Sequence, residues 1–303
     1  MEPINIAKKS HLNKLSDEQG IFKIVAIDHR AVYVNDMKRF GASNPSTEDI
    51  IQSKMRLIRL LKEKASSFLL DPLYSANQAI ENKALGDKGL LIGIEGNDYS
   101  STEFKDDYLT DLIDVETIAK IGGDCVKVFF YYYFNDIINE KQFALLRKIS
   151  AKCKKFDLPL LLEPIIAPQF DNRDIMEKIS LNKQMLDELS VLDVDIFKIM
   201  FPTDTDIFSM EECIAQCKDV TSSLKAPFIT LTSGVTEDIF FKQLEIISKA
   251  GGSGFAVGRT LWRGCIYGKD ENIKDNIEKM NKSFDKMSDI ASNYGKDWKT
   301  ILK

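Results

Sequence analysis

Two lysines lie inside strongly apolar stretches of the sequence, where a charged side chain is unexpected. Lys198 lies in DIFKIMFP, residues 195–202, and Lys127 lies in CVKVFFYY, residues 125–132. Because an unpaired ammonium is costly to bury, such a lysine either pairs with a carboxylate or gives up its proton. Two lysines that lie close together also disfavour each other's charge, which lowers the pKa of at least one of them. A neutral lysine attacks carbonyl groups and forms a Schiff base, so these positions indicate chemistry on a carbonyl compound.

Two carboxylates are candidates for the proton transfers that such chemistry needs. An iminium ion withdraws electrons, so a carbon–carbon bond β to it can break and leave an enamine, and an acid and a base must then move protons. Glu163, in LPLLLEPI (158–165), is suited to this work, and Asp28 ends the run FKIVAID. The structural alternative is that the two lysines form buried ion pairs, that Glu163 ends a strand and that Asp28 caps a loop. The occurrence of all four residues at successive strands favours the catalytic interpretation.

Short β-rich apolar runs alternate with longer amphipathic stretches, a pattern that predicts βα units around a parallel sheet. Eight strands are expected, over residues 22–28, 66–72, 89–95, 125–132, 158–165, 194–202, 227–233 and 252–258. Eight strands, each followed by a helix, in a chain of 303 residues predict an α/β fold of the (β/α)₈ TIM-barrel type. No GxGxxG motif follows the first strand, which argues against a doubly wound dinucleotide-binding sheet.

The stretches between the strands carry signals for helix starts and stops. Residues 46–65 open with a Ser/Thr cap and acidic residues, and residues 140–156 close with basic residues, which the helix dipole favours at that end. Thr236 can cap a helix over residues 236–252, which paired glycines stop. These signals support the βα alternation.

Length and composition limit the class of protein. Without a linker or low-complexity tract, one domain is expected over residues 1–303, with residues 1–20 and about 270–303 as terminal appendages packed on the barrel. No signal peptide or membrane span is recognisable, so a cytoplasmic protein with no membrane partner is expected. A net charge of −5 with evenly spread basic residues argues against a nucleic-acid partner and favours a small molecule. The oligomeric state is left open, and a homo-oligomer is compatible with the sequence.

Residues that bind metals are few. The five cysteines are scattered without a CxxC pair, so neither a disulfide framework nor a zinc site is indicated. The only histidines, His11 and His29, cannot supply the imidazole ligands that a metal-dependent form of this chemistry usually needs. We therefore expect no metal and no cofactor.

A second group of polar residues ends the last two strands. In a barrel of this kind, functional groups come from the C-terminal ends of strands, and the loops after strands seven and eight commonly bind phosphate. Here these ends read Thr232-Ser233-Gly234 and Gly258-Arg259. Backbone amides and a helix N-terminus can hold an anion there, and Arg259 would add a charged fork. A simple turn is the alternative for each, but their pairing favours an anion site.

Together these residues resemble a known family, the class I, Schiff-base-forming aldolases of the tagatose 1,6-bisphosphate aldolase type, with the related sulfofructose 1-phosphate aldolases. The resemblance spans roughly residues 15–265. It lies in the ordered motifs LSDEQGIFKIVAIDHR (15–30), SSFLLDP (66–72), GGDCVKVFFYY (122–132), LLLEPIIAP (160–168), VDIFKIMFP (194–202), ITLTSGV (229–235) and GSGFAVGRTLW (252–262).

The resemblance implies a role for each matched residue. Lys198 is similar to the Schiff-base lysine and Lys127 to the second lysine beside it, while Glu163 is similar to the acid/base. Asp28 matches the carboxylate that contacts substrate hydroxyls and helps to orient the iminium. The residues implied for binding the substrate and its 1-phosphate are His29, Arg30, Ser233, Gly234, Gly258 and Arg259.

Two departures from the family pattern concern the substrate. The family usually has Asp-Gln-Arg where this chain has Asp28-His29-Arg30, and relatives commonly have glutamate where this chain has Met200. EPIIAP and TSGV read more like the sulfosugar branch than the tagatose branch, so a sulfonated ketose is one expected substrate.

The favoured hypothesis is a class I aldolase that cleaves a ketose 1-phosphate, of the tagatose or fructose bisphosphate or the 6-sulfofructose 1-phosphate type, to dihydroxyacetone phosphate and an aldehyde. A transaldolase that transfers the three-carbon unit to an acceptor aldehyde is the first alternative. A non-catalytic sugar-phosphate sensor is the second, and His29 and Met200 are the features that favour it.

Overall fold

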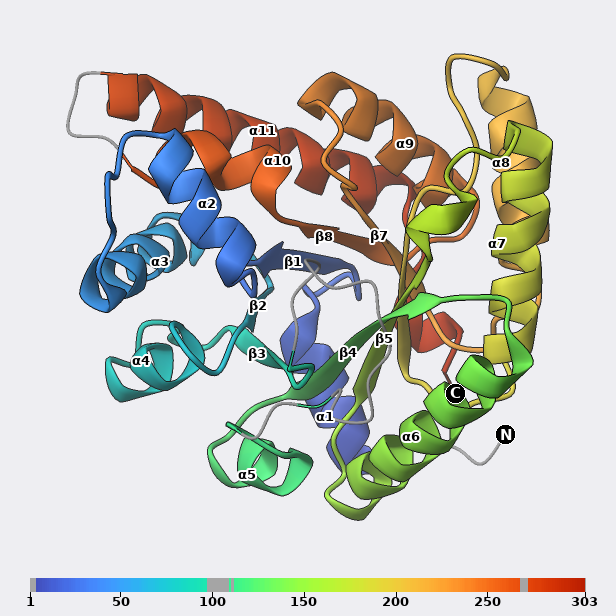
Figure 1. The fold of residues 1–303 in the computed structure, drawn as a ribbon, viewed down its shortest axis with the longest axis horizontal. Coiled ribbons are helices and arrows are strands. Elements are labelled where there is room, and N and C mark those ends of the chain that lie inside the picture. Colours follow the sequence, from blue (N-terminus) through green and yellow to red (C-terminus); the bar gives the residue numbers. More distant parts are fainter. Residues whose placement is uncertain (1–3, 97–108, 110–111, 268–271, 303) are drawn as a thin grey trace.

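The structure, a computed structural model, describes residues 4–96, 109, 112–267 and 272–302. Eight parallel strands form a closed barrel in the order β1 to β8, with helices outside it, as predicted from the sequence (Figure 1). The strands are β1 (Phe22–Ala26), β2 (Ser67–Leu70), β3 (Gly89–Gly93), β4 (Cys125–Tyr132), β5 (Leu160–Ile166), β6 (Ile196–Ile199), β7 (Phe228–Leu231) and β8 (Gly254–Val257).

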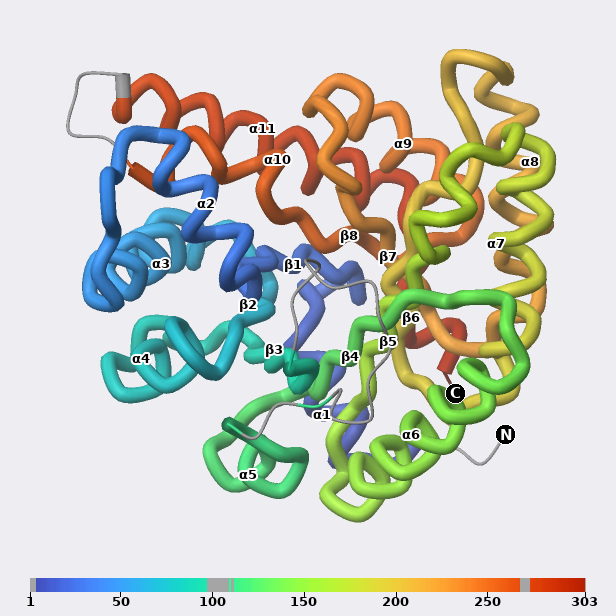
Figure 2. Tube along the Cα trace, viewed as in Figure 1, coloured from blue at the N-terminus to red at the C-terminus, as the bar shows by residue number. Residues whose placement is uncertain are grey.

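The helices follow the chain around the barrel, which can be traced in Figure 2. They are α1 (Ile6–Leu15), α2 (Ala31–Arg39), α3 (Thr47–Leu61), α4 (Ala76–Glu81), α5 (Val115–Lys120), α6 (Asp136–Lys155), α7 (Ile175–Leu189), α8 (Met210–Val220), α9 (Glu237–Lys249), α10 (Arg259–Trp262) and α11 (Asn272–Tyr294). Short 3₁₀ turns lie at Pro168–Phe170, Arg263–Cys265 and Trp298–Thr300. None of the helices in the described ranges is long and apolar enough to cross a membrane.

The predicted helix signals act as expected, with small differences. Ser46 and Asp49 form a reciprocal capping box at the start of α3. The chain enters α6 earlier than predicted, because the Asn135 side chain accepts hydrogen bonds from two backbone amides at the first turn. Thr236 is the N-cap of α9 but makes no side-chain cap bond, and Gly251 leaves the helix at a φ of 109°.

Strand alternation sorts the inward side chains into an apolar layer and a charged layer. Successive side chains of a strand point to opposite faces, so on β4 Cys125 and Lys127 share the inner face. Every residue of β4 from Cys125 to Phe130 is buried. The same spacing repeats on β5 with Leu161 and Glu163, and on β6 with Ile196 and Lys198; all six lie below 5% exposure. On each of three neighbouring strands, the charged residue therefore follows the apolar one by two positions on the inner face.

The lower, apolar layer is closed by the terminal segments. Leu12 and Leu15 of α1 and Trp298 are fully buried against the inner residues of the barrel. Trp298 stacks on Phe22 of β1, with ring centroids 6.5 Å apart, and its indole nitrogen donates to Ser16. These contacts place α1 and the C-terminal turn at the end of the barrel opposite the charged layer. Of the predicted appendages, residues 1–3, 270–271 and 303 lie outside the described residues.

Candidate active site

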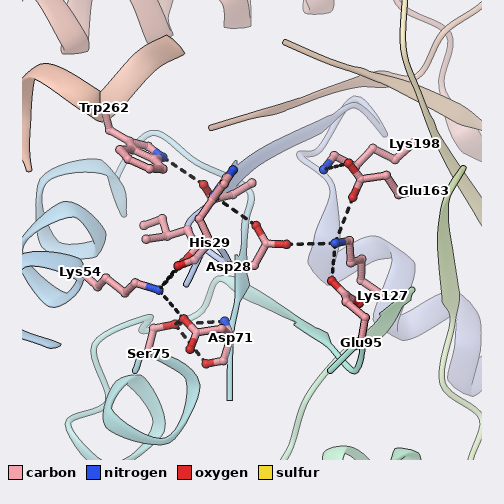
Figure 3. Close-up of polar contacts among 12 residues, drawn as sticks. Asp28, His29, Lys54, Asp71, Ser75, Glu95, Lys127, Glu163, Lys198 and Trp262 are labelled. Carbon is pink, nitrogen blue, oxygen red and sulfur yellow. Dashed lines mark hydrogen bonds and ion pairs between the residues drawn. The ribbon is translucent and has the colours of Figure 1, made fainter. Parts of the chain in front are cut away.

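Lys127 is the centre of a buried ion cluster. Its side chain is fully buried, and its Nζ atom lies 3.0 Å from Asp28, 2.6 Å from Glu95 and 3.0 Å from Glu163 (Figure 3). Asp28 and Glu95 follow the ends of β1 and β3, whereas Glu163 comes from the neighbouring strand β5. Three carboxylates surround the ammonium of Lys127, so buried ion pairs balance its positive charge.

Lys198 joins the same cluster through Glu163. Its Nζ atom lies 2.8 Å from Oε1 of Glu163, whose other oxygen faces Lys127 (Figure 3). Glu163 is 1% exposed and Lys198 is 4% exposed, so both groups are almost completely removed from water. One carboxylate thus bridges two buried lysines.

The charges set the pKa values of the acidic members in different directions. Burial would raise the pKa of Asp28, but Lys127, His29 and Lys198 outweigh it and hold that pKa well below its ordinary value. Burial likewise opposes the charge on Glu163, and its two lysine neighbours nevertheless lower its pKa. For Glu95 burial prevails over Lys127, so its pKa is raised. Asp28 and Glu163 are therefore carboxylates at neutral pH.

A cavity of about 360 Å³ opens over this cluster at the C-terminal ends of the strands. Lys198 and Glu163 line it, so the lysine amine and its carboxylate partner face the space where a substrate can lie. The remaining lining residues include Ala26, His29, Val32, Tyr131, Ile165, Met200, Leu231, Thr232, Ser233, Gly234, Ala256, Gly258 and Arg259. The cavity therefore has charged side chains at its base and both apolar and polar residues along its walls.

His29 forms one wall of the cavity as a neutral imidazole. Burial lowers its pKa to about 4, because the attraction of Asp28 does not offset it and Arg259 and Lys198 add to the lowering. The ring packs on Gly258, where an added Cβ would lie 3.1 Å from Cε1 of His29. Trp262 packs edge to face with the His29 ring, at a centroid distance of 5.6 Å. Gly258 thus leaves the room that His29 occupies.

Arg259, Ser233 and Gly234 lie together at the strand ends of β7 and β8. Ser233 and Gly234 both have left-handed backbone conformations, with φ of 45° and 78°. Arg259 is the first residue of α10, and within the described residues it makes no ion pair. A guanidinium that borders a cavity without a carboxylate partner is suited to an anionic ligand.

The match to a family of known proteins agrees with this geometry. A family model described as DeoC/LacD family aldolase matches residues 22–264. The chain belongs to the DeoC/LacD family of aldolases. Tagatose 1,6-diphosphate aldolase 1 of Enterococcus faecalis is 29% identical to this aldolase over 284 residues, which cover 86% of each chain. The tagatose 1,6-diphosphate aldolase of Streptococcus pneumoniae is 28% identical over 315 residues, 91% of this chain and 94% of that one.

Solved structures of aldolases share the fold. An archaeal fructose-1,6-bisphosphate aldolase, with its catalytic lysine covalently bound to the carbinolamine intermediate, superposes with a TM-score of 0.63 at 17% identity, over 94% of this chain and 99% of that one. Fructose-bisphosphate aldolase from Plasmodium falciparum gives a TM-score of 0.70 at 15% identity, over 96% and 95% of the chains. At these identities the likeness concerns the barrel itself.

The structure brings most of the predicted site residues of this aldolase together. The cavity is lined by Lys198, Glu163, His29, Ser233, Gly234, Gly258 and Arg259. Asp28 and Lys127 lie in the ion cluster, in contact with that lining. Arg30 is different, because its guanidinium donates to the backbone oxygen of Glu95 at 3.0 Å and does not belong to the lining.

Three charged residues of the site region, Glu95, Asp71 and Lys54, are not among the site residues predicted from the sequence. Glu95 and Asp71 were recognisable as polar strand ends, yet only the fold reveals that Glu95 contacts Lys127. Lys54 pairs with Asp71 and is fully buried. Its signal is a lysine on the apolar stripe of α3, four residues after Ile50 and four before Ile58.

No group of three or more histidine, cysteine, aspartate and glutamate residues in the described parts of the chain is arranged to hold a metal ion. All five cysteines are buried and free.

Proposed function

We propose that this aldolase is a class I enzyme that cleaves a ketose 1-phosphate through a Schiff base on Lys198, which gives dihydroxyacetone phosphate and an aldehyde. The observation that carries the proposal is the 2.8 Å contact between Lys198 and Glu163 at the base of the cavity. A nucleophile within hydrogen-bond reach of its own acid/base is what imine chemistry requires.

Formation of the imine starts with a proton transfer inside this pair. Burial favours the neutral acid form of Glu163, and the charges of Lys127 and Lys198 oppose it. Transfer of the Lys198 proton to Glu163 removes one of these charges and leaves a neutral amine. The amine attacks carbon 2 of the ketose, and the carbinolamine hydroxyl leaves as water with the proton that Glu163 returns. The products are an iminium ion on Lys198 and a Glu163 carboxylate.

Cleavage uses the same carboxylate, which now accepts a proton first and returns it afterwards. Glu163 accepts the proton of the carbon-4 hydroxyl while the C3–C4 bond breaks, and the bonding electrons neutralise the iminium as an enamine. The aldehyde leaves. Glu163 then returns the proton to carbon 3, and water hydrolyses the resulting imine to dihydroxyacetone phosphate. The sequence needs no external oxidant, reductant or metal ion.

Lys127 and Asp28 hold this machinery in place and in charge balance. The Lys127 ammonium fixes one oxygen of Glu163 at 3.0 Å, which leaves the other oxygen directed at Lys198. Asp28 is held as a carboxylate by Lys127 and, in our proposal, contacts substrate hydroxyls. Preorganised charges of this kind stabilise a developing charge without moving during the reaction.

The 1-phosphate is assigned to Arg259 and the turn at Ser233 and Gly234. Two features support this assignment, the guanidinium at the cavity edge and the neighbouring strand ends of β7 and β8. Relatives named as tagatose 1,6-diphosphate aldolases support a phosphorylated ketose as the substrate class. His29 and Met200 border the same cavity and are expected to select the distal part of the sugar.

The test is a cleavage assay with purified protein and three ketose phosphates, namely tagatose 1,6-bisphosphate, fructose 1,6-bisphosphate and 6-sulfofructose 1-phosphate. Release of dihydroxyacetone phosphate that persists in a chelator is the expected result. Turnover only after an acceptor aldehyde is added would indicate a transaldolase. No turnover and no adduct with any of them, in a folded protein, would contradict the proposal.

A further inference from the structure

A further buried lysine, Lys54, lies beside the ion cluster but not in it. Its side chain, in the middle of α3, is fully buried. The ammonium donates to the backbone oxygens of Ile27 at 3.0 Å and His29 at 2.7 Å, and to Oδ2 of Asp71 (Figure 3). The three acceptors match the three protons of a lysine ammonium. Lys54 therefore bonds the chain on both sides of Asp28.

Asp71, the partner of Lys54, is itself fixed by the chain that follows β2. One oxygen accepts from the amides of Leu73 and Tyr74 at 3.0 and 2.7 Å, and the other accepts from the Ser75 hydroxyl at 2.7 Å. Asp71 is 2% exposed. The position of the Lys54 ammonium is thus set by a rigid carboxylate and not by solvent.

The segment that Lys54 holds lies where the barrel sheet ends, and the Ile27 amide still donates to the Leu69 oxygen of β2 at 2.8 Å. β1 ends at Ala26, and Asp28 and His29 follow it. The Ala26 oxygen accepts from the indole of Trp262 at 2.9 Å, so side chains of α10 and α3 take over where strand pairing ends. The orientation of Asp28 and His29 therefore depends on these side-chain bonds.

We propose that Lys54 and Asp71 act as a positioning pair, which holds Asp28 against Lys127 and His29 on Gly258, and that the aldol chemistry at Lys198 depends on it. The inference rests on the proposed function and concerns residues that contact neither substrate nor Lys198. Its route is a series of contacts. Lys54 bonds the backbone on both sides of Asp28, the Asp28 carboxylate lies 3.0 Å from Lys127, and Lys127 lies 3.0 Å from Glu163.

A purely stabilising role is a weak account of this pair. Two charges removed from water recover little net stability compared with apolar side chains of the same volume. What the pair adds is a fixed position of the backbone around Asp28. An apolar residue at position 54 would fill the space but leave the Ile27 and His29 oxygens without their donor. A displacement of about 1 Å of a group in an active site can cost about a hundredfold in rate.

The chain offers a matched control at the other end of the barrel. Lys8 of α1 is 8% exposed and pairs with Asp195 at 2.8 Å, before the start of β6. Lys8→Met therefore removes a buried lysine–aspartate pair of the same type but leaves the carbonyls beside Asp28 untouched. Comparison of Lys54→Met with Lys8→Met separates lost stability from lost positioning.

The experiment compares wild type, Lys54→Met, Asp71→Asn and Lys8→Met by thermal unfolding, by borohydride trapping with dihydroxyacetone phosphate, and by exchange of the carbon-3 hydrogen of that compound in deuterated water. We expect the positioning variants to keep the adduct on Lys198 while exchange and kcat fall by about 10- to 100-fold. KM should stay within about twofold, because the contacts with phosphate are unchanged. Lys8→Met should lose thermal stability without this change in kcat.

Unchanged exchange and kcat in folded Lys54→Met or Asp71→Asn would overturn the inference, as would an equal loss in Lys8→Met. If neither positioning variant folds, Ser75→Ala decides by the same readouts, because it removes the hydroxyl that donates to the Asp71 carboxylate and accepts from the Asp71 amide. A wild-type chain that forms no adduct and turns over no ketose phosphate would remove the proposed function and this inference with it. An active wild type with an unaffected Lys54→Met would remove the inference alone.

Discussion

Lys198 and Glu163 lie on adjacent strands of the barrel with 2.8 Å between the lysine nitrogen and a carboxylate oxygen. Both side chains are buried, and the second oxygen of Glu163 is occupied by Lys127. The pair can therefore exchange one proton without moving, while the remaining charge of the cluster stays in place. This relationship ties the chemistry of the amine to one carboxylate.

Glu163→Gln should remove the proton carrier without a change of shape. Because the amide neither accepts the Lys198 proton nor returns it to carbon 3, kcat should fall by roughly 10²- to 10⁴-fold. Steady-state cleavage assays measure this loss. Glu116→Gln, at an exposed carboxylate paired with Lys120 on α5, is the control. Equal activity of the two variants would assign the acid/base to another group.

Lys127→Met should destabilise the protein as well as inactivate it. The change leaves Asp28, Glu95 and Glu163 close together without their shared cation, and breaking such a buried pair costs roughly 3–5 kcal/mol. Chemical denaturation at neutral pH measures the free energy of unfolding. Lowering the pH should narrow the gap to wild type, because protonation relieves the carboxylates of the variant. A variant as stable as wild type at neutral pH would show that the cluster carries no such charge balance.

His29→Gln should make the protein less sensitive to acid. The pKa of His29 falls from 6.5 to about 4 on folding, so between these values the unfolded chain takes up a proton that the folded chain excludes. Its contribution is fully present above pH 6.5 and is lost as the pH falls through 4, in total about 3 kcal/mol. The free energy of unfolding, measured from pH 8 to 4 in wild type and variant, isolates the contribution of His29. Parallel curves would mean that His29 is not kept neutral.

Arg259→Gln should weaken binding of the phosphate more than it slows the chemistry. Loss of a charge-assisted contact should raise KM for a ketose 1-phosphate by roughly 10- to 100-fold. Borohydride trapping with unphosphorylated dihydroxyacetone should be unaffected. Arg263→Gln is the matched control, since this neighbouring arginine is paired with Asp36 at 3.0 Å. An equal rise of KM in both variants would contradict the assignment of the phosphate site.

The barrel could be predicted from the sequence because its signals are local. The apolar runs, the Ser46 cap and the glycines after α9 each act within a few residues, and the eight strands fall inside the predicted ranges with only Ile166 of β5 beyond them. Strand ends differ because Asp28, Asp71 and Glu95 leave the hydrogen-bonded ladder to make side-chain contacts at the barrel mouth.

The candidate site could be predicted where one residue type stood out against its surroundings. Lys127 and Lys198 were visible because strands made of apolar residues surround them. Lys54 could not be recognised in this way, because lysines are common in amphipathic helices and the sequence alone does not reveal that this one lies on the buried face. The partners of Lys127 also depend on register: Phe129 pairs with Glu163, and this alignment of β4 with β5 is a property of the closed barrel.

A Schiff base on Lys198 can be trapped by reduction and located in the chain by mass spectrometry. Wild type and Lys198→Ala are incubated with dihydroxyacetone phosphate, reduced with borohydride and analysed by intact-protein and peptide mass spectrometry, with Lys183→Ala as a surface-lysine control. We expect one reduced adduct in wild type and in the control, on the peptide that contains Lys198, and none in Lys198→Ala. An adduct that persists in folded Lys198→Ala, or no adduct in folded wild type, would contradict a Schiff base on Lys198.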